Sequence, residues 1–91
     1  MSIETVSPAG ILPAIPHEFV WRSAAGAPFT VVLMDAAYRE IGRFDAIADD
    51  HVEVDGHWRA AMTAGGVFHW TVAGTVEGRR VGSPTEQFEI R

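Results

Sequence analysis

The chain contains no cysteine and no lysine. Without cysteine it can form neither a disulfide nor a thiolate nucleophile. Without lysine it cannot complete a phosphate-binding P-loop. Its seven cationic side chains are all arginine, and twelve acidic residues outnumber them, so the formal net charge is −5. An acidic chain with scattered cations is poorly suited to a phosphate backbone, and we expect no binding to nucleic acid.

Long apolar runs are also missing from the sequence. No run approaches the roughly 20 residues of a membrane helix, so we expect no direct membrane insertion. The start, Met1 to Glu4, lacks the basic and apolar regions of a signal peptide. We expect a periplasmic or extracytoplasmic location if the chain is part of an envelope protein, and a cytoplasmic one if it is free-standing. The sequence leaves the oligomeric state open.

The residues that are present favour an all-β fold. Five prolines and nine glycines separate short apolar runs, and 47% of the residues are hydrophobic. Apolar side chains alternate with others along the segments 18–23, 29–33, 66–73 and 85–90. A weaker strand over 40–47 requires a bulge at Gly42 or a turn. These segments predict one all-β domain with seven or eight strands, a number that fits a sandwich. Residues 1–13 form an N-terminal tail or a broken edge strand.

Asp55 and Gly56 lie between two apolar-patterned runs, which indicates a β-hairpin. A three-residue loop over 55–57 places Val54 opposite Trp58 and makes one face of the hairpin apolar. Because burial specifies register strongly, we favour this loop over a two-residue one. Trp58 then belongs to the core; if it is instead exposed, it marks a ligand or partner surface.

The segment Met62-x-Ala64-Gly65-x-x-Phe68-x-Trp70-x-Val72 resembles the fibronectin type III signature Leu-x-Pro-Gly-x-x-Tyr-x-aromatic-x-Val. Phe68 stands in place of the corner Tyr, and Ala64 in place of Pro. Three further marks follow the family in order: Trp21 on the second strand, Phe29-x-Val31-x-Leu33 on the third, and Ser83-Pro84 before a last strand with Phe88.

This resemblance covers residues 14–91 and implies an immunoglobulin-like, fibronectin type III-like β-sandwich of two antiparallel sheets, similar to modules of bacterial envelope sensor and anti-sigma-type proteins. It further implies a non-catalytic interaction or spacer module of an envelope-associated or regulatory protein, which acts through contacts with a protein partner. No enzyme activity is expected, since the serines lack a nucleophile-elbow signature. The sequence does not identify the partner or the parent protein.

Exposed aromatic and arginine side chains favour interfaces. Tyr38 in the loop 36–40, and Arg79 with Arg80 in the loop 74–82, are therefore the candidate partner-binding residues. His69 lies between Phe68 and Trp70, so it faces outward if those two face inward. It then joins a binding surface, or is an ordinary residue of the outer face.

Two other functions remain open. Asp49, His51, Glu53, Asp55 and His57 recur with period two, which can put them on one strand face as ligands for Zn²⁺ or Mn²⁺. A straight row converges poorly on one ion, so we favour a solvated face, expect no cofactor, and keep Asp49, His51 and Glu53 as weak metal candidates. A small carbohydrate-binding module is the other alternative, and it needs two exposed aromatics such as Trp58 and Tyr38.

Overall fold

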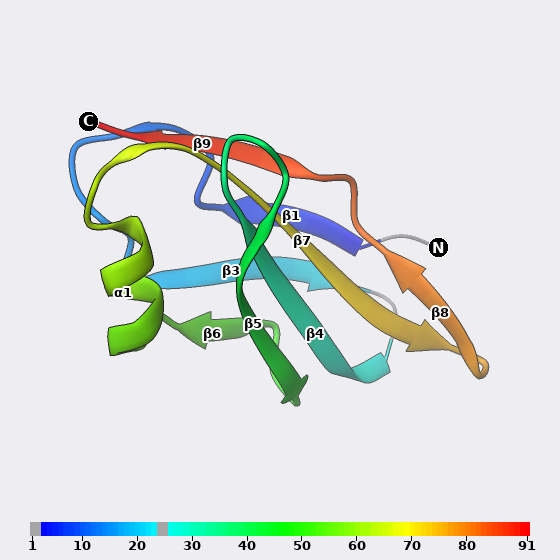
Figure 1. Cartoon of the computed structure of the whole chain (residues 1–91). Coiled ribbons are helices and arrows are strands. Elements are labelled where there is room, and N and C mark those ends of the chain that lie inside the picture. The colour runs from blue at the N-terminus through cyan, green and yellow to red at the C-terminus, as the bar shows by residue number, and fades with distance from the viewer. Residues whose placement is uncertain (1–2, 24–25) are drawn as a thin grey trace.

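The computed structural model describes residues 3–23 and 26–91, which form two β-sheets and one short helix (Figure 1). The first sheet has the order β1-β3-β6. The second has the order β2-β9-β7-β4-β5, and β8, which is not part of this linear order, pairs with β7. The bounds of the strands are β1 Ile3–Ser7, β2 Gly10–Leu12, β3 Glu18–Ser23, β4 Gly26–Met34, β5 Glu40–Ile47, β6 His51–Glu53, β7 Gly66–Val76, β8 Arg79–Gly82 and β9 Glu86–Ile90.

The prediction of a mostly β chain with two sheets is confirmed. Two details differ from it, because the described residues form nine strands and one strand pair is parallel. The strands β1 and β2, of which β2 forms the parallel pair with β9, lie at the N-terminal end, and β8 forms within the segment 74–82, which the sequence predicts to be a loop. After Ser7 the chain leaves the first sheet, and Gly10–Leu12 then runs parallel to Phe88–Ile90 in the second. The Trp70 indole Nε1 donates to the backbone oxygen of Pro8 at 3.0 Å, at the point where the chain changes sheets.

The core lies between the two sheets and is largely aromatic. The Phe19 ring of β3 meets the Trp70 ring of β7 edge-on, with centroids 4.9 Å apart, and the Phe88 ring of β9 at 5.8 Å. Trp21 and Phe29 pack in the same way at 5.7 Å. Alternating positions of the strands supply most of the buried set: Ile3, Phe19, Trp21, Phe29, Val31, Leu33, Trp58, Met62, Phe68, Trp70, Val72, Phe88 and Ile90.

The hairpin expected at Asp55-Gly56 is wrong, because this segment forms the helix α1, Gly56–Met62. The Asp55 carboxylate accepts a hydrogen bond from the backbone N–H of Trp58 at 2.9 Å and so caps the helix. Trp58 and Met62 lie four residues apart on one face, and both are buried. An Asp-Gly pair is compatible with a hairpin or with a helix start. Burial of Trp58 and Met62 selects the helix.

Trp58 belongs to the core, as expected. It reaches the core from helix α1 and not from a hairpin strand. Its ring packs against Phe44 at 4.5 Å and against Phe19 at 5.0 Å. Gly42 of β5 lies directly beneath the indole, since a Cβ at this position would come within 2.5 Å of Trp58 Nε1. The strand register shifts between Gly42 and Glu40, as the bulge or turn predicted at Gly42 requires.

Candidate binding surface

The turn between β4 and β5 is organised by the side chain of Asp35. Its Oδ1 accepts hydrogen bonds from the backbone N–H groups of Ala37 at 2.8 Å and Arg39 at 2.9 Å. Its Oδ2 lies 3.0 Å from Nε of Arg39. The hydrogen bond from the Arg39 backbone is the largest of the effects that hold the pKa of Asp35 below its ordinary value. One carboxylate therefore fixes both the backbone and a side chain of this turn.

Tyr38 occupies the tip of the same turn. Its φ of 64° lies in the left-handed region, which is uncommon for a bulky residue. Its backbone N–H donates to the Asp35 carbonyl at 3.0 Å, and the Asp35 N–H donates to the Arg39 carbonyl at 2.9 Å. The Tyr38 side chain is 62% exposed and stacks on the imidazole of His69, with ring centroids 4.1 Å apart and planes 6° from parallel. One face of the phenol ring is thus held against the protein.

His69 is placed differently from the sequence expectation. It alternates with Phe68 and Trp70 on the outer side of β7, but it is only 4% exposed. Met34 of β4 and Gln87 of β9 flank it in the sheet, and Tyr38 covers its ring. Its Nδ1 is buried and makes no hydrogen bond within the described residues. The alternation of β7 correctly places His69 on the outer face. It does not reveal that the Tyr38 ring, from the turn between β4 and β5, covers His69.

Arg79 and Arg80 lie at the opposite end of β7 from His69. They begin β8, pair with Val76 and Thr75, and are exposed. At a rise of about 3.3 Å per residue, the distance along β7 from His69 to Val76 is on the order of 20 Å. Neither arginine forms an ion pair with a described residue. Of the four candidate contact residues, the structure brings together Tyr38 and His69 and leaves the two arginines apart from them.

The acidic and histidine row does not form a single strand face. β6 contains only His51 to Glu53, while Asp55 caps α1 and His57 lies within that helix. His51 Nδ1 lies 3.3 Å from Oδ1 of Asp50, and this contact is the main cause of a raised pKa at His51. Within the described residues, no group of three or more His, Asp and Glu side chains is arranged to hold a metal ion.

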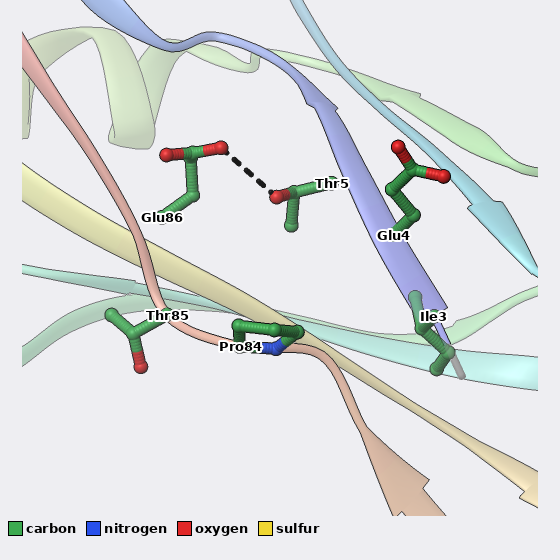
Figure 2. A pocket seen from close by; sticks show the side chains of 6 residues that line it. All are labelled: Ile3, Glu4, Thr5, Pro84, Thr85 and Glu86. Atoms are coloured by element: carbon green, nitrogen blue, oxygen red, sulfur yellow. Dashed lines mark hydrogen bonds between the residues drawn. The ribbon is translucent and has the colours of Figure 1, made fainter. Parts of the chain in front are cut away.

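A cleft of about 440 Å³ opens between β1 and the segment that leads into β9 (Figure 2). The hydroxyl of Thr5 donates to Oε1 of Glu86 at 3.1 Å across it. No sequence motif indicates this cleft, because its two sides lie about eighty positions apart along the chain. Its lining residues are Ile3, Glu4, Thr5, Pro84, Thr85 and Glu86.

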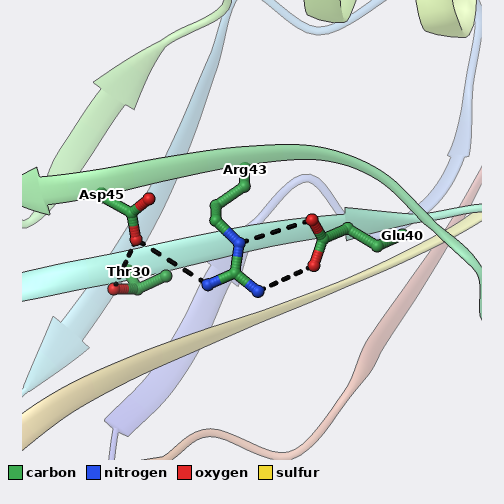
Figure 3. Close-up of polar contacts among 4 residues, drawn as sticks. All are labelled: Thr30, Glu40, Arg43 and Asp45. Carbon is green, nitrogen blue, oxygen red and sulfur yellow. Dashed lines mark hydrogen bonds and ion pairs between the residues drawn. The ribbon is translucent and has the colours of Figure 1, made fainter.

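The outer side of β4 and β5 carries a chain of polar contacts centred on Arg43 (Figure 3). Its guanidinium forms two hydrogen bonds with Glu40, at 2.8 and 3.4 Å, and lies 3.8 Å from Asp45. Arg43 lowers the pKa of Glu40, mainly through this hydrogen bonding, and Glu40 raises the pKa of Arg43. Exposed pairs of this kind stabilise a fold little, but charges along an edge strand such as β5 oppose pairing with another chain.

Comparison of the chain with protein-family models, curated proteins and solved structures finds no match. The described part of the chain also contains no helix with the length and apolar character needed to cross a membrane. The function proposed for this chain therefore rests on the geometry of these surfaces.

Proposed function

We propose that this chain is a non-catalytic binding module that contacts a protein partner through the turn 35–39, with Tyr38 as the central residue. The exposed Tyr38 ring, stacked on buried His69, is the observation that carries this proposal. A tyrosine supplies a large amphipathic contact area at low conformational cost. The Asp35 hydrogen bonds fix the turn before a partner arrives, which reduces the entropy lost on binding.

The finer fold belongs to the same proposal. We propose an immunoglobulin-like, fibronectin type III-like sandwich, because in the strand orders β1-β3-β6 and β9-β7-β4-β5 the chain changes sheets from β3 to β4, from β5 to β6 and from β6 to β7. The inward positions of Trp21 and Trp70 support it. A role in a bacterial envelope-associated or regulatory protein rests on the sequence resemblance alone.

Protein binding is favoured here over carbohydrate binding. A carbohydrate platform needs at least two exposed rings, and Trp58 is buried in the core. All nine aromatic residues lie in the described part of the chain, and Tyr38 alone among them is exposed. A single exposed ring on a structured turn suits a protein contact better than a sugar stack.

Affinity capture tests the proposal. The wild-type chain, Tyr38→Ala and Arg79→Glu are immobilised at equal density and exposed to a lysate of the cells that produce the protein. Arg79→Glu is the matched control, because it alters an exposed residue about 20 Å away along β7. We expect the wild type and Arg79→Glu to retain the same protein, and Tyr38→Ala to lose it. Equal capture by Tyr38→Ala, or no specific capture by the wild type, contradicts the proposal.

A further inference from the structure

The free edge of β1 directs backbone hydrogen-bonding groups away from its own sheet. The Trp21 N–H of β3 donates to the carbonyl of Asp50, on the β6 side, at 2.9 Å. Because the N–H and C=O of one strand residue point the same way, Trp21 directs neither group toward β1. Thr5 pairs with Trp21 across the antiparallel ladder, so this is a non-hydrogen-bonded pair. The N–H and C=O of Thr5, and those of Ile3 two residues earlier, therefore point outward from the sheet.

The cleft lies on this outward side of β1. Among the described strands, β1 pairs with β3 alone. Figure 2 shows β1 between β3 and the segment Pro84 to Glu86, which forms the opposite wall of the cleft. The cleft volume of about 440 Å³ falls within the range of small-ligand sites. An unpaired strand edge beside a wall of side chains is the geometry to which an extended peptide adds as a new strand.

The charge of the cleft specifies the occupant further. Two carboxylates line it and no cationic side chain does. Glu4 lies opposite Arg22 of β3, but Glu86 forms no ion pair with a described residue. Glu86 accepts hydrogen bonds from the Thr5 hydroxyl and from the backbone N–H of Gln87, so its carboxylate is held at the cleft.

We propose that this cleft binds an extended segment of a protein partner, which adds a strand to the free edge of β1 and places a lysine or arginine beside Glu86. A second copy of this chain is disfavoured as the occupant, because two-fold pairing of β1 with itself brings the acidic residues of the two copies together. The cleft shares no residue with the turn 35–39. The proposal is thus independent of the Tyr38 surface and can fail separately from it.

Selection from a phage-displayed library of random dodecapeptides, panned on the intact chain, tests this proposal. Thr5→Pro removes the outward N–H without breaking a ladder bond to β3, and proline is accepted on edge strands. Thr5→Val is its matched control, since it removes the hydroxyl and keeps the N–H. Glu86→Gln removes the charge and keeps the acceptor. Glu89→Gln makes the same change outside the cleft, on the outer side of β9.

We expect the enriched peptides to carry arginine or lysine among β-branched residues. A synthetic copy of the most enriched peptide should bind Thr5→Pro about tenfold more weakly than the wild type. Glu86→Gln should weaken it roughly two- to fivefold at physiological salt. Thr5→Val should lower its affinity no more than Glu86→Gln does, and Glu89→Gln and Tyr38→Ala should leave its affinity unchanged.

Three results overturn the proposal. The first is the absence of any enriched peptide. The second is equal affinity of the peptide for the wild type and Glu86→Gln, a comparison that holds even if Thr5→Pro fails to fold. The third is concentration-dependent dimerisation of the wild type that Glu86→Gln strengthens, because this result assigns the β1 edge to a second copy.

Discussion

Trp58 and Tyr38 are large aromatic residues in short connections between strands, and the fold places them in opposite environments. Trp58 is 1% exposed and packs against Phe19 and Phe44. Tyr38 is 62% exposed and touches the protein through one face of its ring. Burial of its ring accounts for the position of Trp58, whose indole Nε1 makes no hydrogen bond within the described residues. The position of Tyr38, with its positive φ and the hydrogen bonds around it, is not required by the core and is the one that suggests a binding role.

The largest effect should come from Trp58→Ala. Removal of a buried tryptophan leaves a cavity and typically costs about 3–5 kcal/mol of folding free energy. Tyr38→Ala should cost less than about 1.5 kcal/mol, the value of an aromatic stacking contact. Denaturant unfolding of both variants measures the difference. If Tyr38→Ala destabilises the chain as much as Trp58→Ala does, Tyr38 is a structural residue.

Gly42→Ala sharpens the account of Trp58. The added methyl group meets the indole at 2.5 Å and must displace it, so we expect a loss of about 1–3 kcal/mol. Gly56→Ala is the matched control, because a Cβ there meets no atom within 4 Å and alanine favours the helix. Thermal unfolding should rank Gly42→Ala below the wild type and Gly56→Ala at or above it. The reverse order contradicts the packing of α1 on β5.

The smallest effect concerns the turn of Tyr38 at low pH. The folded pKa of Asp35 lies below its unfolded value of about 3.9. Its stabilising contribution is therefore fully present above that pH and is lost as the pH falls through the folded pKa. The amide proton of Ala37, which donates to this carboxylate, should titrate in an NMR experiment with a midpoint below the ordinary pKa of an aspartate. The transition should vanish in Asp35→Asn, and a midpoint at or above the ordinary pKa of an aspartate contradicts the hydrogen bonding of Asp35 in this turn.

Local alternation predicts the strands β3, β4, β7 and β9. It does not predict β8, which forms in a segment expected to be a loop, or the helix α1. The segment 18–23 coincides with β3 because its inward residues Phe19 and Trp21 alternate with outward ones. The sequence predicts a hairpin where helix α1 forms, because Asp55-Gly56 suits both structures. The four-residue spacing of the buried Trp58 and Met62 decides for the helix.

The surfaces were harder to predict than the strands. Exposure of Tyr38 follows from its place in a polar connection, but burial of His69 depends on the Tyr38 turn folding over β7. The cleft joins Thr5 to Glu86, and the parallel pairing of β2 with β9 joins equally distant segments. Contacts at such separations leave no periodic signal in the sequence. The binding roles assigned to Tyr38 and to the cleft stay proposals.

The central claim is that Tyr38 on its structured turn carries partner binding. The dissociation constant of the captured partner, measured by calorimetry for the wild type and for Tyr38→Ala, tests it most directly. We predict at least about tenfold weaker binding by Tyr38→Ala, with its unfolding free energy close to that of the wild type. Equal dissociation constants for the two proteins contradict the claim.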